Sequence, residues 1–170
     1  MKHLHKGEGV TMFYYQLLMS SDKELDIKTL NNVAVNYFEL GLWDLSYQIW
    51  DELYHGIQSS PENYSVLLPV ISCNMGNALR QTGYYEEAYR VLMQGLKRCC
   101  GTGAIYAMPE LVMQLSILRM KRGNIQEAKS LYSFGKNIFC WSRQSDMNQS
   151  IEEIMEQDFL LYCTEENASH

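Results

Sequence analysis

Apolar residues recur along this chain at the three- and four-residue spacing of amphipathic helices, and the helical stretches come in pairs with a glycine between them. Ser21-x-x-Glu24 and Asn124-x-x-Glu127 resemble N-terminal caps, and Gly41 suits a left-handed C-terminal cap. The predicted pairs are 22–40 with 43–58, 61–82 with 84–99, and 104–122 with 124–139. Apolar faces also predict a short helix within 10–19 and a further helix at about 150–163. We therefore expect an almost wholly helical chain without β-sheet.

Three glycines occupy the same point of a repeated pattern: Gly41, Gly83 and Gly123 are separated by 42 and 40 residues. A small residue lies seven positions before each glycine, and a second lies five positions after it. Small side chains at these points allow two helices to cross closely, with large apolar residues filling the space between them. The small residues are Ala34, Gly76 and Ser116 before the glycines, and Ser46, Ala88 and Ala128 after them. A period of this length indicates an array of structural repeats.

This pattern resembles the tetratricopeptide repeat, a helix-turn-helix unit. The resemblance implies an all-α fold, an α-solenoid of three tetratricopeptide-like helical hairpins with N- and C-terminal capping helices. An N-terminal tail and short helix would occupy 1–21, and a C-terminal capping helix and tail would occupy 145–170. The three repeats would fill 22–144, at about 22–59, 60–101 and 102–144. Because repeat arrays are recognition surfaces more often than reaction centres, function is expected in the groove of the array.

Two of the three prolines follow the same register, since Pro69 and Pro109 each lie fourteen residues before a glycine of the pattern. A proline inside a helix removes one hydrogen bond, and its ring clashes with the preceding turn. The first helix of each pair should therefore begin near its proline or kink there. The extra residues in front of the prolines lead us to expect bent, lengthened first helices.

Composition and charge narrow the functional classes. The 170 residues carry a net charge of −6 and show no cluster of lysine and arginine, so we expect no nucleic-acid binding through this chain alone. Five cysteines, an odd number without a Cys-x-x-Cys motif, indicate reduced packing residues in a cytoplasmic protein. No apolar run is long enough to cross a bilayer, so no membrane association is expected.

The sequence contains no recognisable catalytic constellation. His3 and His5 could ligate a metal but lack further ligands, and His55 has no apparent partner for a nucleophile relay. No phosphate-binding loop, nucleotide fingerprint or metalloprotease motif occurs. We therefore expect a protein that is not an enzyme and that has no catalytic residues, metal site or cofactor.

The resemblance to tetratricopeptide repeats also implies where a ligand would bind. In such arrays the first helix of each pair lines the concave side, and its exposed positions lie ten, six, three and two residues before the glycine. In the middle repeat these positions are mostly polar, and Asn74 precedes Asn77 by nearly one helical turn. The candidate peptide-binding residues are Asn31, Phe38, Asn74, Asn77, Arg80, Gln81, Met113 and Met120.

Each of these candidates has a structural alternative. Asn77 offers a donor and an acceptor that suit a peptide unit, but asparagine is also common there in repeats without a ligand. Arg80 could bind a carboxylate through its planar fork, or it could pair with Glu39 or another neighbouring acid. Met113 belongs either to an adaptable apolar floor of the groove or to the core between repeats. Arg119 replaces the large residues at the corresponding point of the other repeats and could face the last helix.

Three features together resemble the C-terminal repeat domains of Gram-positive, peptide-responsive transcription regulators: the long period, the pairs Leu68-Pro69 and Met108-Pro109, and the run from Gly83 to Ala88. In that group an N-terminal DNA-binding helix-turn-helix precedes the array, and this sequence shows none. The expected function is a cytoplasmic module that binds a peptide or protein segment, either as the effector-sensing part of a bacterial regulator or on its own. The alternative is an oligomerising scaffold, such as a homodimer, with no ligand in the groove.

Overall fold

The structure is a computed structural model that describes residues 23–59 and 64–142. Within these ranges every regular element is a helix, which confirms the all-α prediction. The described helices are α2 (Lys23–Glu39), α3 (Trp43–Ser59), η1 (Ser65–Leu67), α4 (Leu68–Gln81), α5 (Tyr85–Thr102), η2 (Ile105–Ala107), α6 (Met108–Lys121) and α7 (Ile125–Ser142). The helices expected within 10–19 and 150–163 lie outside the described residues, as does Pro61.

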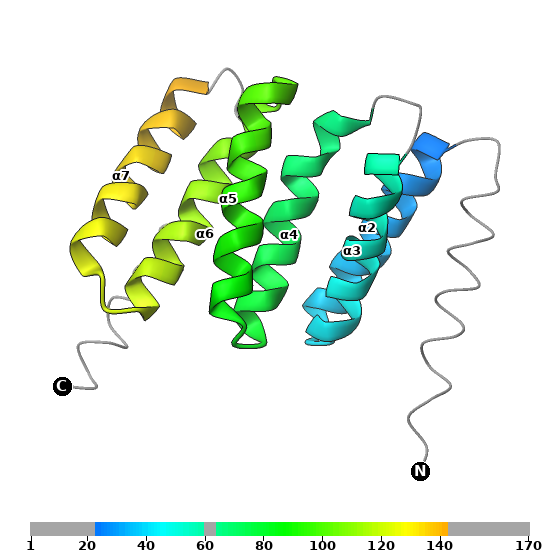
Figure 1. Ribbon diagram of the computed structural model, residues 1–170, viewed down its shortest axis with the longest axis horizontal. Coiled ribbons are helices and arrows are strands. Elements are labelled where there is room, and N and C mark those ends of the chain that lie inside the picture. Colours follow the sequence, from blue (N-terminus) through cyan, green and yellow to red (C-terminus); the bar gives the residue numbers. More distant parts are fainter. Residues whose placement is uncertain (1–22, 60–63, 143–170) are drawn as a thin grey trace, which may run out of the picture.

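The α-helices form three antiparallel hairpins that stand side by side in a row (Figure 1). Consecutive helices contact one another along the whole row, from α2 with α3 to α6 with α7. The first helices of the second and third hairpins, α4 and α6, also contact each other directly. This contact matters for the candidate site, because it brings the predicted groove residues of neighbouring repeats together.

The turn at the pattern glycine has the same conformation in each hairpin. Gly41, Gly83 and Gly123 have φ angles of +75°, +87° and +75°, in the left-handed region that favours glycine. The amide after each glycine donates to the carbonyl five residues earlier, at 2.9 Å in all three turns. This is the Schellman arrangement, which satisfies carbonyl groups at the helix end. The repeated register predicted from the glycines is therefore a repeated backbone structure.

The helices of each hairpin cross at the small residues of the pattern. Ala34, Ser46, Ser116, Ala88 and Ala128 are all fully buried, at 0% exposure. In the middle hairpin, a Cβ added to Gly76 would lie 2.5 Å from Cγ and Cδ2 of Leu92. The prediction that Ala88 and Ala128 are buried at helix crossings is confirmed.

The prediction of lengthened first helices is wrong. Both α4 and α6 contain only fourteen residues, and Pro69 and Pro109 lie in their first turns. A proline in the first turn loses nothing, because its missing N–H would have no partner within the helix. The extra residues of each repeat instead form a short 3-10 turn, η1 or η2, in front of the helix.

Candidate functional site

The predicted groove residues lie on the first helices of the hairpins, α2, α4 and α6, where the structure divides them into polar and apolar groups. The asparagines of α2 and α4 are partly accessible, whereas Arg80 of α4 and the methionines of α6 are buried. Two hydrogen-bonded groups of amide side chains connect the three helices.

The first group is centred on Asn31 of α2. Its Oδ1 atom accepts a hydrogen bond from Nε1 of Trp50 at 3.1 Å and another from Nδ2 of Asn74 at 3.2 Å. Trp50, on α3, is only 2% exposed, while the two asparagines are half-buried. The buried indole therefore holds Asn31, which in turn holds Asn74 of the next hairpin.

The second group is centred on Arg80 of α4. Its Nη2 atom donates to Oδ1 of Asn77 at 2.6 Å, and its Nε atom donates to Oε1 of Gln114 at 3.1 Å. Arg80 is 7% exposed and Gln114, on α6, is 9% exposed. The guanidinium group thus bridges two neighbouring first helices. Gln114 is not among the predicted residues, because it lies outside the positions that the resemblance assigns to the concave side.

The remaining predicted residues divide between the core and the surface. Met113 and Met120 are 3% and 2% exposed and belong to an apolar cluster with Ile117 and Ala128, which favours the core interpretation of both methionines. Phe38 is half-buried and its ring centroid lies 6.0 Å from that of Trp50. Gln81 is exposed.

A buried thiol lies one helical turn before Asn77. Burial raises the pKa of the Cys73 thiol well above its ordinary value, and the negative charge of Glu110 adds to the shift. Burial raises the pKa of Cys99 to about 11. Both thiols therefore stay protonated at neutral pH, and neither has the thiolate character that a nucleophile needs.

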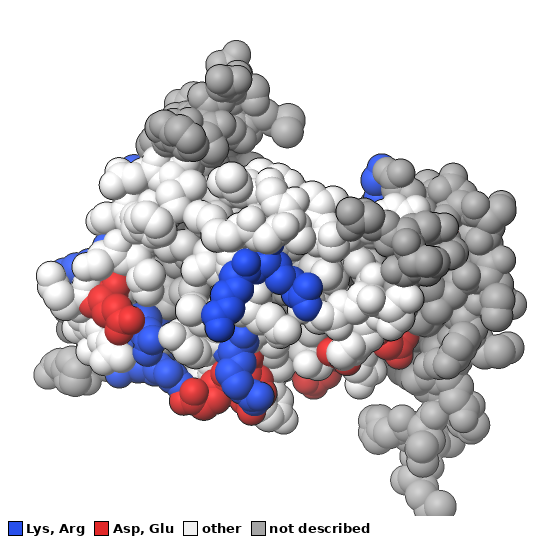
Figure 2. Space-filling model, turned by 45° about the horizontal axis from the view of Figure 1, so that its top comes forward, with Lys and Arg blue, Asp and Glu red and all other residues white. Residues whose placement is uncertain are grey.

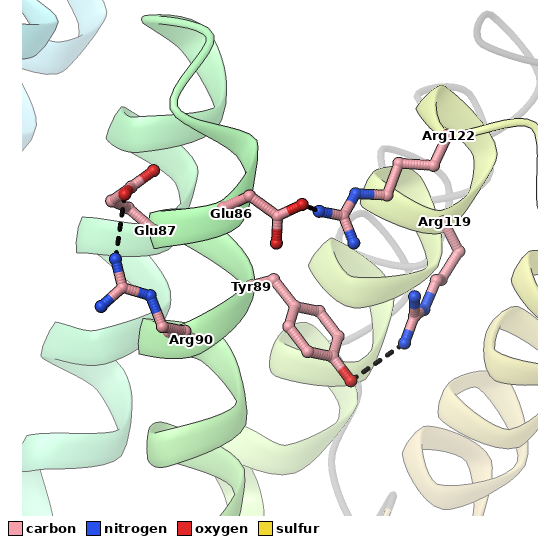
Figure 3. Close-up of polar contacts among 6 residues, drawn as sticks. All are labelled: Glu86, Glu87, Tyr89, Arg90, Arg119 and Arg122. Carbon is pink, nitrogen blue, oxygen red and sulfur yellow. Dashed lines mark hydrogen bonds and ion pairs between the residues drawn. The ribbon is translucent and has the colours of Figure 1, made fainter.

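Arg119, the departure from the repeat pattern, faces α5 and α7. Its guanidinium group lies 4.5 Å from the ring centroid of Tyr89 and donates to the hydroxyl oxygen at 2.9 Å. Its Nε atom forms an ion pair with Glu127 of α7 at 3.1 Å. Arg122 pairs with Glu86 of α5, and Figure 3 shows both arginines reaching from the end of α6 toward α5. This cluster links three helices where the other repeats use apolar packing.

Most of the face shown in Figure 2 is uncharged, and along its lower edge several lysine or arginine side chains lie beside acidic ones. Among the described residues, no three histidine, cysteine or acidic side chains are placed to hold a metal ion. No helix in the described ranges is long and apolar enough to cross a membrane.

No protein-family model matches the sequence, and no curated protein matches it. The arguments for function therefore come from the geometry of the site.

Proposed function

We propose that this chain is a non-catalytic, cytoplasmic module that binds a peptide or protein segment across its first helices α2, α4 and α6. The observation that carries the proposal is the hydrogen bonding of the Asn77 side chain. Its Oδ1 atom is held by Arg80, but its amide nitrogen makes no hydrogen bond among the described residues. Asn77 is half-buried, so part of this residue remains accessible to solvent.

Asn74 supports the same assignment. One of its N–H groups is used by Asn31, and its Oδ1 atom accepts no hydrogen bond within the described ranges. Asn74 and Asn77 are three positions apart on one helix, so their side chains are neighbours. Together they offer an acceptor and a donor, the two groups that pair with the N–H and C=O of a peptide. The resemblance to peptide-responsive regulators favours the same interpretation, with the peptide as the effector.

The experiment is a selection from a phage-displayed library of randomised heptapeptides, followed by calorimetry on the enriched peptides. Asn77→Ala should weaken binding by about 1–3 kcal/mol, because it leaves a peptide carbonyl without its donor. The melting temperature should fall modestly, because alanine also leaves one donor of the buried Arg80 without its acceptor. Asn137→Ala is the matched control: Asn137 is exposed on α7, a second helix, and its replacement should leave both quantities unchanged.

Two results would contradict the proposal. If Asn77→Ala binds the enriched peptides like the wild type but melts much lower, Asn77 is a structural residue. If no peptide is enriched and the chain forms concentration-dependent oligomers in sedimentation, the scaffold alternative is favoured instead.

A further inference from the structure

The orientation of the groove amides follows from two side chains that can only donate hydrogen bonds. The indole N–H of Trp50 and the guanidinium group of Arg80 have no acceptor atom. The atom of Asn31 that faces Trp50 must therefore be its oxygen, and so must the atom of Asn77 that faces Arg80. Because the same oxygen of Asn31 also faces Asn74, the atom that Asn74 presents to it must be the amide nitrogen.

This chain of contacts gives the two asparagines of α4 opposite orientations. Asn74 points its nitrogen toward α2 and leaves its oxygen for a ligand. Asn77 points its oxygen toward Arg80 and leaves its nitrogen for a ligand. Reversing either amide would place two donors or two oxygens against each other, which removes a hydrogen bond and adds a repulsion. The groove therefore presents an acceptor at position 74 and a donor at position 77 before any ligand arrives.

From this geometry we infer that Arg80 is a positioning residue that fixes Asn77 as a donor to the backbone carbonyl of an extended peptide, with Asn74 accepting from a backbone N–H. The inference rests on the proposed function and names what the site recognises, which is the peptide backbone. An extended peptide presents the N–H and C=O of one residue on the same edge, as in a hydrogen-bonded pair of a β-ladder. An acceptor and a donor on neighbouring positions of α4 match such an edge.

The surroundings of Arg80 fit positioning better than direct contact with a ligand carboxylate. The side chain is 7% exposed, and two of its donors are used by Asn77 and Gln114. Gln114 fixes the guanidinium from α6, so the orientation of Asn77 depends on the contact between two repeats. A preorganised amide loses less conformational freedom on binding, which strengthens binding without any new contact.

The orientation can be tested without a ligand by two substitutions that each replace an amide nitrogen with oxygen. In Asn77→Asp, one carboxylate oxygen keeps the contact with Arg80, now assisted by charge, so the melting temperature should equal or exceed that of the wild type. In Asn74→Asp, an oxygen would face Oδ1 of Asn31, which Trp50 holds in place. The melting temperature should fall by about 2–4 °C. The opposite pattern would show that the amides are oriented the other way and would overturn the inference.

The binding test uses a heptapeptide enriched from the randomised library, in three forms: unmodified, C-terminally amidated, and with single backbone amides replaced by esters. Asn77→Asp should weaken binding about ten-fold or more, because an oxygen would now face the peptide carbonyl. At least one ester replacement should weaken binding to the wild-type protein but not to the Asn74→Ala variant. That replacement identifies the backbone N–H from which Asn74 accepts a hydrogen bond.

The role of Arg80 is separated from a structural role by a double-mutant cycle. In the wild-type background, Arg80→Met should weaken peptide binding about ten-fold. In an Asn77→Ala background it should have little further effect, since the two residues act as a unit. The loss should be the same for the amidated peptide, because no ligand carboxylate is involved. Additive effects, or a loss confined to the free carboxylate, would overturn the inference while leaving peptide binding intact. Failure to enrich any heptapeptide would contradict the proposed function as well.

Discussion

Gly76→Ala tests the close helix crossing on which the repeat structure depends. The new Cβ would lie 2.5 Å from Cγ and Cδ2 of Leu92. Carbon atoms in contact prefer separations of about 3.5–4.0 Å, so the overlap is about 1 Å or more. Leu92 is 0% exposed and cannot move aside without displacing other core residues.

Two effects of opposite sign decide the magnitude. Overpacking of this kind costs about 1–3 kcal/mol. Replacing a helical glycine with alanine gains about 0.5–1 kcal/mol, because the unfolded chain loses conformational freedom. Since the overlapping atoms include Cγ, which is close to the backbone, the steric cost should be the larger effect. The expected net loss is about 1–2 kcal/mol, or about 2–8 °C in melting temperature for a chain of this size.

The assay is thermal unfolding followed by circular dichroism, with Gly101→Ala as the matched control. Gly101 also lies within a helix, α5, but a Cβ there would meet nothing within 4 Å. The control should therefore be neutral or slightly stabilising. In a Leu92→Val background, which shortens the obstructing side chain, Gly76→Ala should cost less than in the wild type. Equal or higher stability of Gly76→Ala itself would refute the proposed crossing geometry.

Two further predictions concern stability. Ala88→Leu should lower the free energy of unfolding in urea by about 1–3 kcal/mol, because Ala88 is fully buried, and an unchanged value would contradict the repeat alignment. Burial and the neighbouring Asp51 raise the pKa of Glu52, so the folded chain binds this proton more tightly, and stability should fall as pH rises above the ordinary value of 4.5. Urea titrations at several pH values measure how the free energy of unfolding depends on pH. Glu52→Gln should make this dependence weaker and raise the free energy of unfolding at pH 7. An unchanged dependence on pH would contradict the prediction.

The sequence predicts the hairpins well because their turns depend on local chemistry. A glycine in the left-handed region is required at the same point of each repeat, and the spacing of Gly41, Gly83 and Gly123 reveals it. The sequence predicts the starts of the first helices less well. A proline is compatible with a first turn or with a kink, and periodicity alone could not show that η1 and η2 precede Pro69 and Pro109.

The candidate site shows the same division. Positions relative to the glycine predict that Asn77 and Arg80 lie on one side of α4, and the structure joins them by a hydrogen bond. The role of Gln114 depends on how α4 and α6 pack, which no local pattern of the sequence encodes. The orientation of Asn74 likewise depends on Trp50, a residue of another helix that acts through Asn31. The direction of these hydrogen bonds can be assigned only from the structure, which shows which amide oxygen faces a side chain that can only donate.

The central claim is that the first helices bind a peptide at Asn77, and side-chain amide signals in a nitrogen–proton correlation spectrum test it most directly. The spectrum would be recorded before and after addition of a library-enriched heptapeptide, with the Asn77 signal assigned from the spectrum of Asn77→Ala. The account predicts that the Asn77 signal shifts with peptide concentration while the Asn137 signal on α7 stays in place. A bound peptide that shifts Asn137 and leaves Asn77 unchanged would contradict the claim.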